Sequence, residues 1–223
     1  DNNSQITGNL SVADEDTGEA VFITQADTAG TYGAFNLATS GGWTYDLDNT
    51  NGVVQALING DTLNDSFTAI SVDGTGSQVV TVTITGVNGA ATITGTSTGA
   101  ATEDNNSQIT GNLSVADEDT GEAVFAEQAL TPGTYGDFTL ATAGAWTYAL
   151  DNGNITVQAL IDGATLSDSF TAISIDGTGS QVVTVTITGV NGLAVITGTS
   201  TGAATEDNST QVAGSLAVTD EDT

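Results

Sequence analysis

The 223-residue sequence contains no lysine, arginine, histidine, cysteine or methionine, and only one proline. Without histidine or cysteine, the chain cannot form a zinc finger, a haem or iron–sulfur site, or a disulfide bond. The usual general bases and the cysteine and lysine nucleophiles are also missing, so the reactive groups are serine, threonine, tyrosine and carboxylates. We therefore expect a protein that is not an enzyme.

The charge of the chain is entirely of one sign. The sequence has 28 acidic residues and a formal net charge of −28, so no salt bridge between side chains can form. Nucleic acid and anionic membranes are not expected partners, because no basic side chain is present to bind phosphate. No stretch approaches the ~18 consecutive apolar residues of a membrane span, and no basic segment of a signal peptide is present. We expect no membrane insertion.

The sequence repeats itself with a period of 103 residues. The segment DNNSQITGNLSVADEDTGEAVF at 1–22 recurs at 104–125, and the offset then holds without a gap, with 85 of 103 positions identical. A third copy starts at Asp207. The chain therefore starts inside one repeat and ends inside another. This phase predicts a longer tandem array, with a repeat lacking its opening strand at 1–91, a complete repeat at 92–194 and the opening strands of a third at 195–223.

The hydrophobic pattern of each repeat is typical of β-strands. Val80, Val82 and Ile84 alternate with threonines, and Asn-Gly and Asp-Gly turn signals fall between such runs. Only 53–57 and its copy suggest a short helical turn. Six to eight short strands per repeat predict an all-β fold of tandem immunoglobulin- or cadherin-like β-sandwiches. A β-solenoid is the alternative, although its period is typically ~20–30 residues.

The alternation also nominates a core for the first repeat. Trp43 is expected in it, because it lies in a W-x-Y-x-L run, although an exposed tryptophan would offer a platform for stacking sugars. The nominated residues are Leu10, Val12, Phe22, Phe35, Leu37, Trp43, Tyr45, Leu47, Leu57, Phe67, Val80, Val82 and Ile84.

Each repeat carries a dense acidic loop, which is DEDTGE at 14–19 and again at 117–122. Two like charges ~5 Å apart repel by about 0.8 kcal/mol even at the dielectric constant of water, and the chain has no cation to offset them. Ca²⁺ prefers such oxygen ligands, so the loop predicts a calcium site. One alternative is a solvated acidic loop. Another is a glycosidase, but every repeat would then need its own active site.

Other oxygens are expected to join the loops near the ends of the sandwiches. They come from the residues after the W-x-Y-x-L run, from the connector between repeats and from the opening strand. The complete set of candidate calcium ligands is Asp14, Asp16, Glu19, Asp48, Asn88, Glu103, Asp104, Asp117, Asp119, Glu122, Asp151, Asn191, Glu206, Asp207, Asp220 and Asp222.

The combination of motifs resembles the VCBS repeat of large, secreted bacterial surface proteins, including RTX-type adhesins. The motifs are ITGTxTGAATED, LSVADEDTGE, GTYGxF, WTYxLDN, VQALIxG, DSFTAISxDG and VTVTITGVNG, and they cover essentially the whole chain. The resemblance implies a cadherin- or immunoglobulin-like sandwich, an extracellular location on a bacterial surface, and calcium bound between domains by Glu103, Asp117, Asp119, Asn88 and Asp48. The family connector N-D-A-P is replaced here by NGAA at 88–91, which leaves the D-x-D loop better supported than the connector.

These observations favour a structural function. We expect an extender repeat of a long extracellular adhesin or surface fibre, stiffened by calcium and in contact with neighbouring identical repeats. One alternative is a module that binds carbohydrate or another cell, for which Tyr32 is the candidate exposed aromatic residue. A second alternative is a filament subunit that assembles by donating a strand to another copy of the chain.

Overall fold

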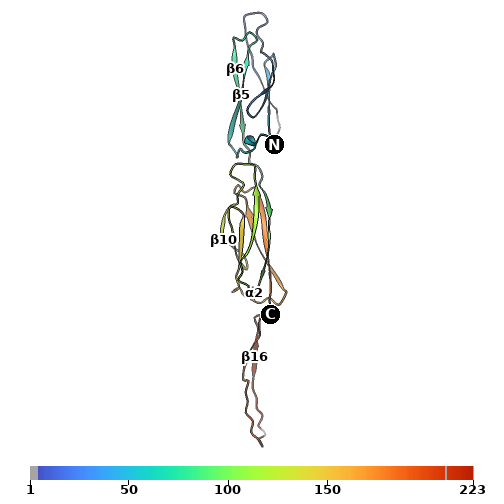
Figure 1. The fold of residues 1–223 in the computed structure, drawn as a ribbon, viewed down its shortest axis with the longest axis vertical. Helices are drawn as coiled ribbons and strands as arrows, with labels where there is room; N and C mark the ends of the chain where they lie inside the picture. Colours follow the sequence, from blue (N-terminus) through green and yellow to red (C-terminus); the bar gives the residue numbers. More distant parts are fainter. Residues whose placement is uncertain (1–4, 209, 223) are drawn as a thin grey trace. The chain divides into compact units, whose positions relative to one another are not determined.

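The computed structural model describes residues 5–208 and 210–222 and consists of two compact units (Figure 1). The first unit contains 1–90 together with the loop 117–123, and the second contains 91–116 and 124–223. Within the described residues, no helix is both long enough and apolar enough to cross a membrane.

The first unit packs a four-stranded antiparallel sheet, in the order β1-β4-β3-β2, against the β5-β6 hairpin. A single helical turn follows β4 and is capped by the Asn51 side chain, which accepts a hydrogen bond from the backbone N–H of Val53. The elements are β1 (Ile6–Asn9), β2 (Gln25–Ala29), β3 (Gly33–Leu37), β4 (Gly42–Leu47), α1 (Gly52–Gln55), β5 (Thr62–Ile70) and β6 (Ser77–Thr85).

The second unit repeats this arrangement and adds two strands at its start. Its sheets have the orders β10-β11-β12-β9-β7 and β13-β14-β8, and β8 pairs with β14 in parallel. A separate hairpin, β15-β16, follows the sandwich. The elements are β7 (Thr92–Gly95), β8 (Thr98–Thr102), β9 (Ile109–Ala116), β10 (Gln128–Pro132), β11 (Gly136–Leu140), β12 (Ala145–Leu150), α2 (Ile155–Gln158), β13 (Thr165–Ile173), β14 (Ser180–Thr188), β15 (Val195–Gly198) and β16 (Leu216–Thr219).

The all-β fold of tandem sandwiches predicted from the alternating pattern is confirmed. In β6, Val80, Val82 and Ile84 are buried, whereas the threonines between them are exposed. This two-residue period is what a sheet with one face on a core requires. The predicted helical turns are present as α1 and α2.

Nine of the thirteen residues nominated for the first core are buried, and the other four are partly buried and packed against it. Phe35 lies at the centre, with its ring centroid 4.4 Å from that of Tyr45 and 4.8 Å from that of Phe67. Trp43 is among the partly buried residues, so it packs on the core but keeps some solvent exposure. Its equivalent in the second unit, Trp146, is completely buried.

A buried carboxylate links the two sheets of the first unit. Asp65 on β5 is only 4% exposed, and its oxygens accept hydrogen bonds from the backbone N–H groups of Thr31 (2.9 Å), Tyr32 (2.8 Å) and Ser66 (3.0 Å). The hydroxyl of Tyr45 donates a fourth bond at 3.1 Å. These donors compensate for the loss of water around the charge, which otherwise makes a buried carboxylate costly.

The same network recurs around Asp168 in the second unit. Its carboxylate accepts hydrogen bonds from the backbone of Thr134 and Tyr135 and from the hydroxyl of Tyr148. Glycine precedes the two N–H donors in both repeats, and a Cβ atom at Gly30 or Gly133 would overlap the carboxylate. The G-T-Y-G motif of the repeat is therefore explained by the close approach of the backbone to this buried acid.

We predict that Asp65→Ala lowers the free energy of unfolding of the first unit by about 2–4 kcal/mol, because it leaves two or more buried donors without an acceptor. Asp61→Ala is the matched control, since it removes the same charge from an exposed side chain. Urea denaturation of the two variants measures the difference. Equal stability of the two variants would show that the buried network contributes nothing.

The pH dependence of the same residue gives a second prediction. Burial opposes the ionisation of Asp65, but the hydrogen bonds from Thr31, Tyr32 and Tyr45 outweigh it and hold the pKa of the carboxyl below its usual range. A lowered pKa stabilises the folded state above the unfolded-state pKa of ~3.9, and this stabilisation is lost as the pH falls through the folded-state pKa.

We therefore expect the difference in unfolding free energy between the wild type and Asp65→Asn to be complete above about pH 5 and to shrink below about pH 3. Denaturation curves at several pH values measure it, with Asp61→Asn as the control for the change in net charge. A difference in unfolding free energy that is independent of pH would contradict a lowered pKa for Asp65.

Candidate metal centre

The acidic loop adopts the same local turn in all three copies. The Asp14 carboxylate accepts a hydrogen bond from the backbone N–H of Asp16 at 2.8 Å, and the equivalent bonds to Asp117 and Asp220 measure 2.9 and 3.0 Å. Asp and Asn commonly stabilise a turn in this way. Gly18 and Gly121 follow with φ of +93° and +86°, a conformation that favours glycine. The D-x-D-x-G spacing thus sets the loop geometry.

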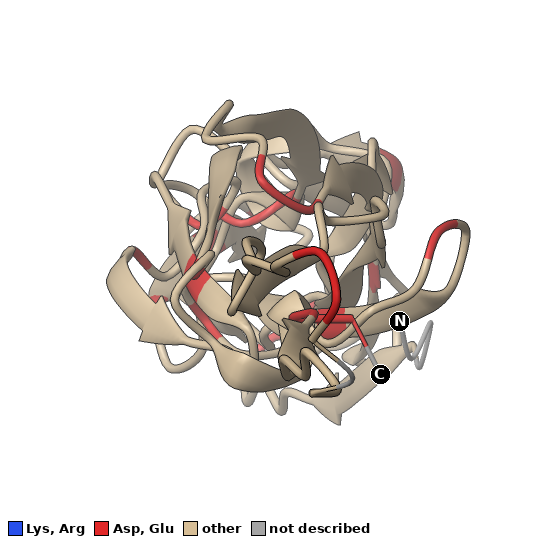
Figure 2. Ribbon diagram, turned by 90° about the horizontal axis from the view of Figure 1, so that it is seen from below, with Lys and Arg blue, Asp and Glu red and all other residues tan. Residues whose placement is uncertain are grey.

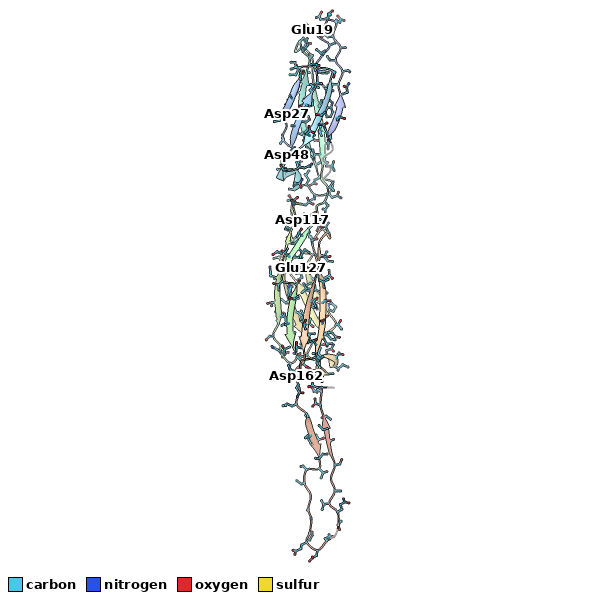
Figure 3. The ribbon with its side chains drawn as sticks, turned by 90° about the vertical axis from the view of Figure 1, so that its right-hand side faces the viewer. Glu19, Asp27, Asp48, Asp117, Glu127 and Asp162 are labelled. Carbon is cyan, nitrogen blue, oxygen red and sulfur yellow. The ribbon has the colours of Figure 1, made fainter. Side chains whose placement is uncertain are left out.

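In the first unit, the loop meets an aspartate from a distant turn. One carboxylate oxygen each from Asp14, Glu19 and Asp73 lie within 4.8 Å of one another. Figure 3 shows Glu19 near one end of this sandwich and Asp48 toward the other. The Ser71 hydroxyl and the Thr75 side chain and backbone donate to Asp73 and lower the pKa of its carboxyl.

A second cluster is formed by Asp117, Asp119 and Glu122, which also bring carboxylate oxygens within 4.8 Å of one another. Asp119 is only 4% exposed, and its Oδ2 accepts a hydrogen bond of 2.7 Å from the backbone N–H of Gly89. The Oδ2 atom of Asp117 is buried and has no hydrogen-bond partner within the described part of the chain. A buried carboxylate oxygen without a donor is costly, and a cation would compensate for it.

The contact to the connector explains why the two clusters differ. Asp119 is buried because the Asn88–Gly89 connector covers it, whereas Asp16 at the same loop position is exposed and lies outside the first cluster. The third copy repeats the contact, since Asp222 Oδ2 accepts a hydrogen bond of 2.7 Å from Gly192 N–H. The loop therefore binds the connector that precedes its own repeat.

The chemistry of both clusters fits a hard cation. Calcium binds carboxylate and carbonyl oxygens, and these clusters offer no nitrogen or sulfur ligand. Two full charges 4.8 Å apart repel by about 0.9 kcal/mol at the dielectric constant of water, and by more where burial lowers it. Figure 2 shows acidic residues on loops and strands and no basic residue. No side chain of the sequence offers a counter-charge to the clusters.

The remaining candidate residues occupy other positions. Asp48 and Asp151 cap turns, accepting hydrogen bonds from the backbone N–H groups of Thr50 and Gly153 at 2.9 Å. Hydrogen bonds from Thr50 also lower the pKa of Asp48. Asn88 and Asn191 each donate from the side-chain amide to the carbonyl of the following glycine. Each connector asparagine thus contacts the glycine whose backbone N–H donates to an acidic loop.

The acidic residues of the opening strands have structural contacts of their own. Glu103 is 3% exposed, and its Oε2 accepts a hydrogen bond of 3.0 Å from the backbone N–H of Val190. Asp104 has a positive φ of 60° and accepts a hydrogen bond from the Gln158 side chain. The third-repeat equivalents, Glu206 and Asp207, are exposed. None of these residues joins the two carboxylate clusters of the described chain.

Asp73 is a functional candidate that sequence reasoning missed. Its Asp-Gly pair is a signal for the turn between β5 and β6, and that reading is correct, since Gly74 has a φ of +78°. Nothing local indicates that this turn approaches the acidic loop. The isolated bridge between Phe22 and Ser71 brings the two segments together.

Comparison with known families gives one match. Residues 88–192, just under half of the chain, match the model of the bacterial cadherin-like domain. A comparison with curated proteins finds no significant match. The matched domain supports a cadherin-like repeat and indicates an extracellular module of adhesion or structure, and it indicates no catalytic family.

Solved structures of cadherins are similar to the chain at low identity. The protocadherin γB4 extracellular domain is 16% identical with a TM-score of 0.45, and the match covers 88% of this chain and 31% of that one. Mouse clustered PcdhgC3 EC1–3 is 15% identical with a TM-score of 0.42, covering 85% and 63%. Chicken VE-cadherin EC1–2 is 16% identical with a TM-score of 0.36, covering 86% and 94%. The chain thus spans less than two thirds of both protocadherin structures.

We predict that Glu122→Gln stabilises the protein after all divalent cations have been removed, by about 0.5–1 kcal/mol at low salt, because it relieves repulsion within the cluster. Glu118→Gln is the matched control, since Glu118 lies in the same loop but is exposed and outside the cluster. Thermal and urea denaturation in chelator measure the effect. A destabilised Glu122→Gln variant would contradict repulsion at this position.

Proposed function

We propose that this chain is a calcium-binding extender module of a long extracellular array. The observation that carries the proposal is the cluster of Asp117, Asp119 and Glu122, in which a buried oxygen of Asp117 has no donor in the described part of the chain. Since the sequence has no cationic side chain, an external cation is the group that completes this cluster. Calcium suits its all-oxygen composition and irregular geometry.

The loop that carries this cluster supports a stiffening role for the ion. The loop 117–123 belongs to the first compact unit, whereas the strands on either side of it belong to the second. Asp119 holds the connector at Gly89, and the backbone N–H of Thr120 donates to Ala56 at the end of α1. An ion bound by the loop would fix its conformation together with these contacts.

The repetition of the sandwich supports a structural function over a catalytic one. The two repeats preserve their cores and buried acid networks, and each has a cluster of three carboxylates. Nine-residue strands such as β6 extend about 30 Å at ~3.3 Å per residue, so each added repeat contributes considerable length. Tandem repetition is an economical way to build such length.

The cellular context of the array is part of the same proposal. The match to the bacterial cadherin-like domain and the resemblance of the motifs to the VCBS repeat support a secreted bacterial surface protein of the adhesin type. Its immediate partners are neighbouring identical repeats. A glycan-binding function is less well supported, because Tyr32 and Trp43 are both partly buried against the first core.

Calcium binding tests the proposal directly. We expect millimolar calcium to raise the melting temperature of the wild type, with a dissociation constant on the order of 10⁻⁴–10⁻³ M as in other extracellular modules. Glu122→Gln should reduce both the heat of binding and the increase in melting temperature, and Glu118→Gln should retain them. Isothermal titration and differential scanning calorimetry provide the two measurements.

Two outcomes would contradict a calcium-binding extender module. Melting temperatures that are identical in calcium and in chelator would overturn the calcium part of the proposal. Strong binding of the chain on a glycan array, with no effect of calcium on stability, would instead support a carbohydrate-binding module.

A further inference from the structure

The loop between β8 and β9 carries an acceptor motif for N-linked sugar. Residues 105–107 read Asn-Asn-Ser, which is an N-x-S/T sequon. A sequon can be modified where its asparagine lies on the surface and the side-chain amide is accessible. Seven asparagines of the sequence begin such a motif, so the structure must decide which of them meet this condition. They are Asn2, Asn9, Asn64, Asn105, Asn112, Asn154 and Asn208.

One sequon occupies the same position in all three copies of the repeat. Asn2, Asn105 and Asn208 follow one another at intervals of 103 residues, and Asn2 lies outside the described residues. The second copy reads Asn-Asn-Ser and the third reads Asn-Ser-Thr, so both residues after the asparagine differ while the motif is retained. This variation favours a requirement for the motif over a requirement for the individual side chains.

Asn105 is presented in a turn that leaves its amide nitrogen accessible. Its side chain is exposed, and its Oδ1 accepts a hydrogen bond of 3.0 Å from the backbone N–H of Ser107. Its Nδ2, the atom that carries the sugar in an N-linked glycan, has no acceptor among the described residues. Ser107 is exposed as well, so both functional groups of the sequon face solvent.

The third copy forms the same turn. Asn208 is exposed, and its Oδ1 accepts hydrogen bonds from the backbone N–H of Thr210 at 3.1 Å and from the Thr210 hydroxyl at 2.5 Å. The hydroxyl of the sequon therefore lies beside the carboxamide of the acceptor asparagine. An enzyme that recognises both groups can contact them from one side.

The other described sequons hold their asparagine differently. Asn9 and Asn112 lie within β1 and β9, and the Nδ2 of each donates to the backbone carbonyl of the following leucine, at 3.1 and 3.0 Å. Asn154 is half-buried, and its Nδ2 donates to the carbonyl of Thr134 at 3.4 Å. Asn64 lies within β5. Modification at these positions requires local opening of a strand or a helix cap, which costs free energy.

We propose that Asn105 is a site of N-linked glycosylation, together with its equivalents in the other copies of the repeat. The sugar donor is a phosphate or pyrophosphate ester, and a sequon-specific glycosyltransferase of the producing cell catalyses the transfer. The Nδ2 of Asn105 forms a bond to the anomeric carbon, the bond from that carbon to the phosphate oxygen breaks, and the phosphate leaves with the electron pair. The Nδ2 releases one proton to a base of the transferase.

The position of this loop is compatible with the rest of the repeat. Glu103, two residues before Asn105, accepts a hydrogen bond from the backbone N–H of Val190, so the loop adjoins the segment that follows β14. In the described chain, neither carboxylate cluster includes a residue of this loop. A glycan here adds a bulky, hydrated group without occupying a candidate calcium ligand of either cluster. The inference thus goes beyond the proposed calcium-binding function and holds or fails independently of it.

The first test uses the protein isolated from the cells that produce it. The sequence has no lysine or arginine, so an endoprotease that cleaves before aspartate replaces trypsin and releases the peptide 104–116. This peptide contains the sequons of both Asn105 and Asn112. Electron-transfer fragmentation keeps the sugar attached and identifies the modified residue. We expect the sugar on Asn105, and an unmodified peptide or a sugar on Asn112 alone would overturn the proposal.

The second test measures whether the fold selects the site. The full chain, produced without glycosylation, and the free peptide 104–116 are each incubated with a sequon-specific N-glycosyltransferase and UDP-glucose. In the peptide, both asparagines should react at comparable rates. In the folded chain, Asn105 should react on the order of tenfold faster than Asn112 or more, because Asn112 must first leave β9. Equal rates in the folded chain would contradict the selection of Asn105.

Two matched variants test the motif itself. Ser107→Ala removes the hydroxyl of the Asn105 sequon but keeps the backbone N–H that bonds to Asn105, and Ser114→Ala removes the hydroxyl of the Asn112 sequon. Both serines are exposed, so neither substitution should change the melting temperature. We expect Ser107→Ala to abolish modification of Asn105 and Ser114→Ala to leave it unchanged. Modification that persists in Ser107→Ala would show that the sequon is not what the transferase reads.

Discussion

The structure depends on how carboxylates are compensated in a chain with no cationic side chain. At Asp65 and Asp168 the compensation is internal, because backbone N–H groups and a tyrosine hydroxyl converge on each buried acid. This arrangement requires glycine and tyrosine at fixed positions of the local sequence. The neighbouring tyrosines respond to the same charge: burial and the adjacent aspartate raise the pKa of Tyr45 and of Tyr148 well above the usual range.

At the acidic loops the internal donors are too few. Asp119 receives the N–H of Gly89 and Asp117 receives that of Asp119, but one buried oxygen of Asp117 has no donor in the described chain. Asp65 and Asp117 therefore represent two kinds of buried acid. One kind is fully hydrogen-bonded within the fold, and the other retains a buried oxygen without a donor in the described chain.

The sequence predicts the fold well because its signals are local. The alternation in β6, the Asn-Gly and Asp-Gly turns and the ungapped repeat require no knowledge of distant contacts, and they led to the sandwich, the helical turns and most of the core. Asp14, Glu19, Asp117, Asp119 and Glu122 were among the candidate ligands predicted from spacing, and the structure brings their carboxylates into two clusters. Asp73 was missed because its approach to the loop depends on the packing of a hairpin far away in sequence. The half-burial of Trp43 was missed for a similar reason, since the same W-x-Y-x-L run gives full burial at Trp146.

The parallel pairing of β8 with β14 has a mechanical consequence. The two strands are the early and late strands of one repeat, and their register aligns Thr98 with Thr184 through to Thr102 with Thr188. When tension is applied along the chain, it pulls β8 toward its amino end and β14 toward its carboxyl end. The strands must then slide past each other in shear, so their hydrogen bonds carry the load together and do not open one at a time. The pairing of β8 with β14 is thereby suited to resist extension of the chain.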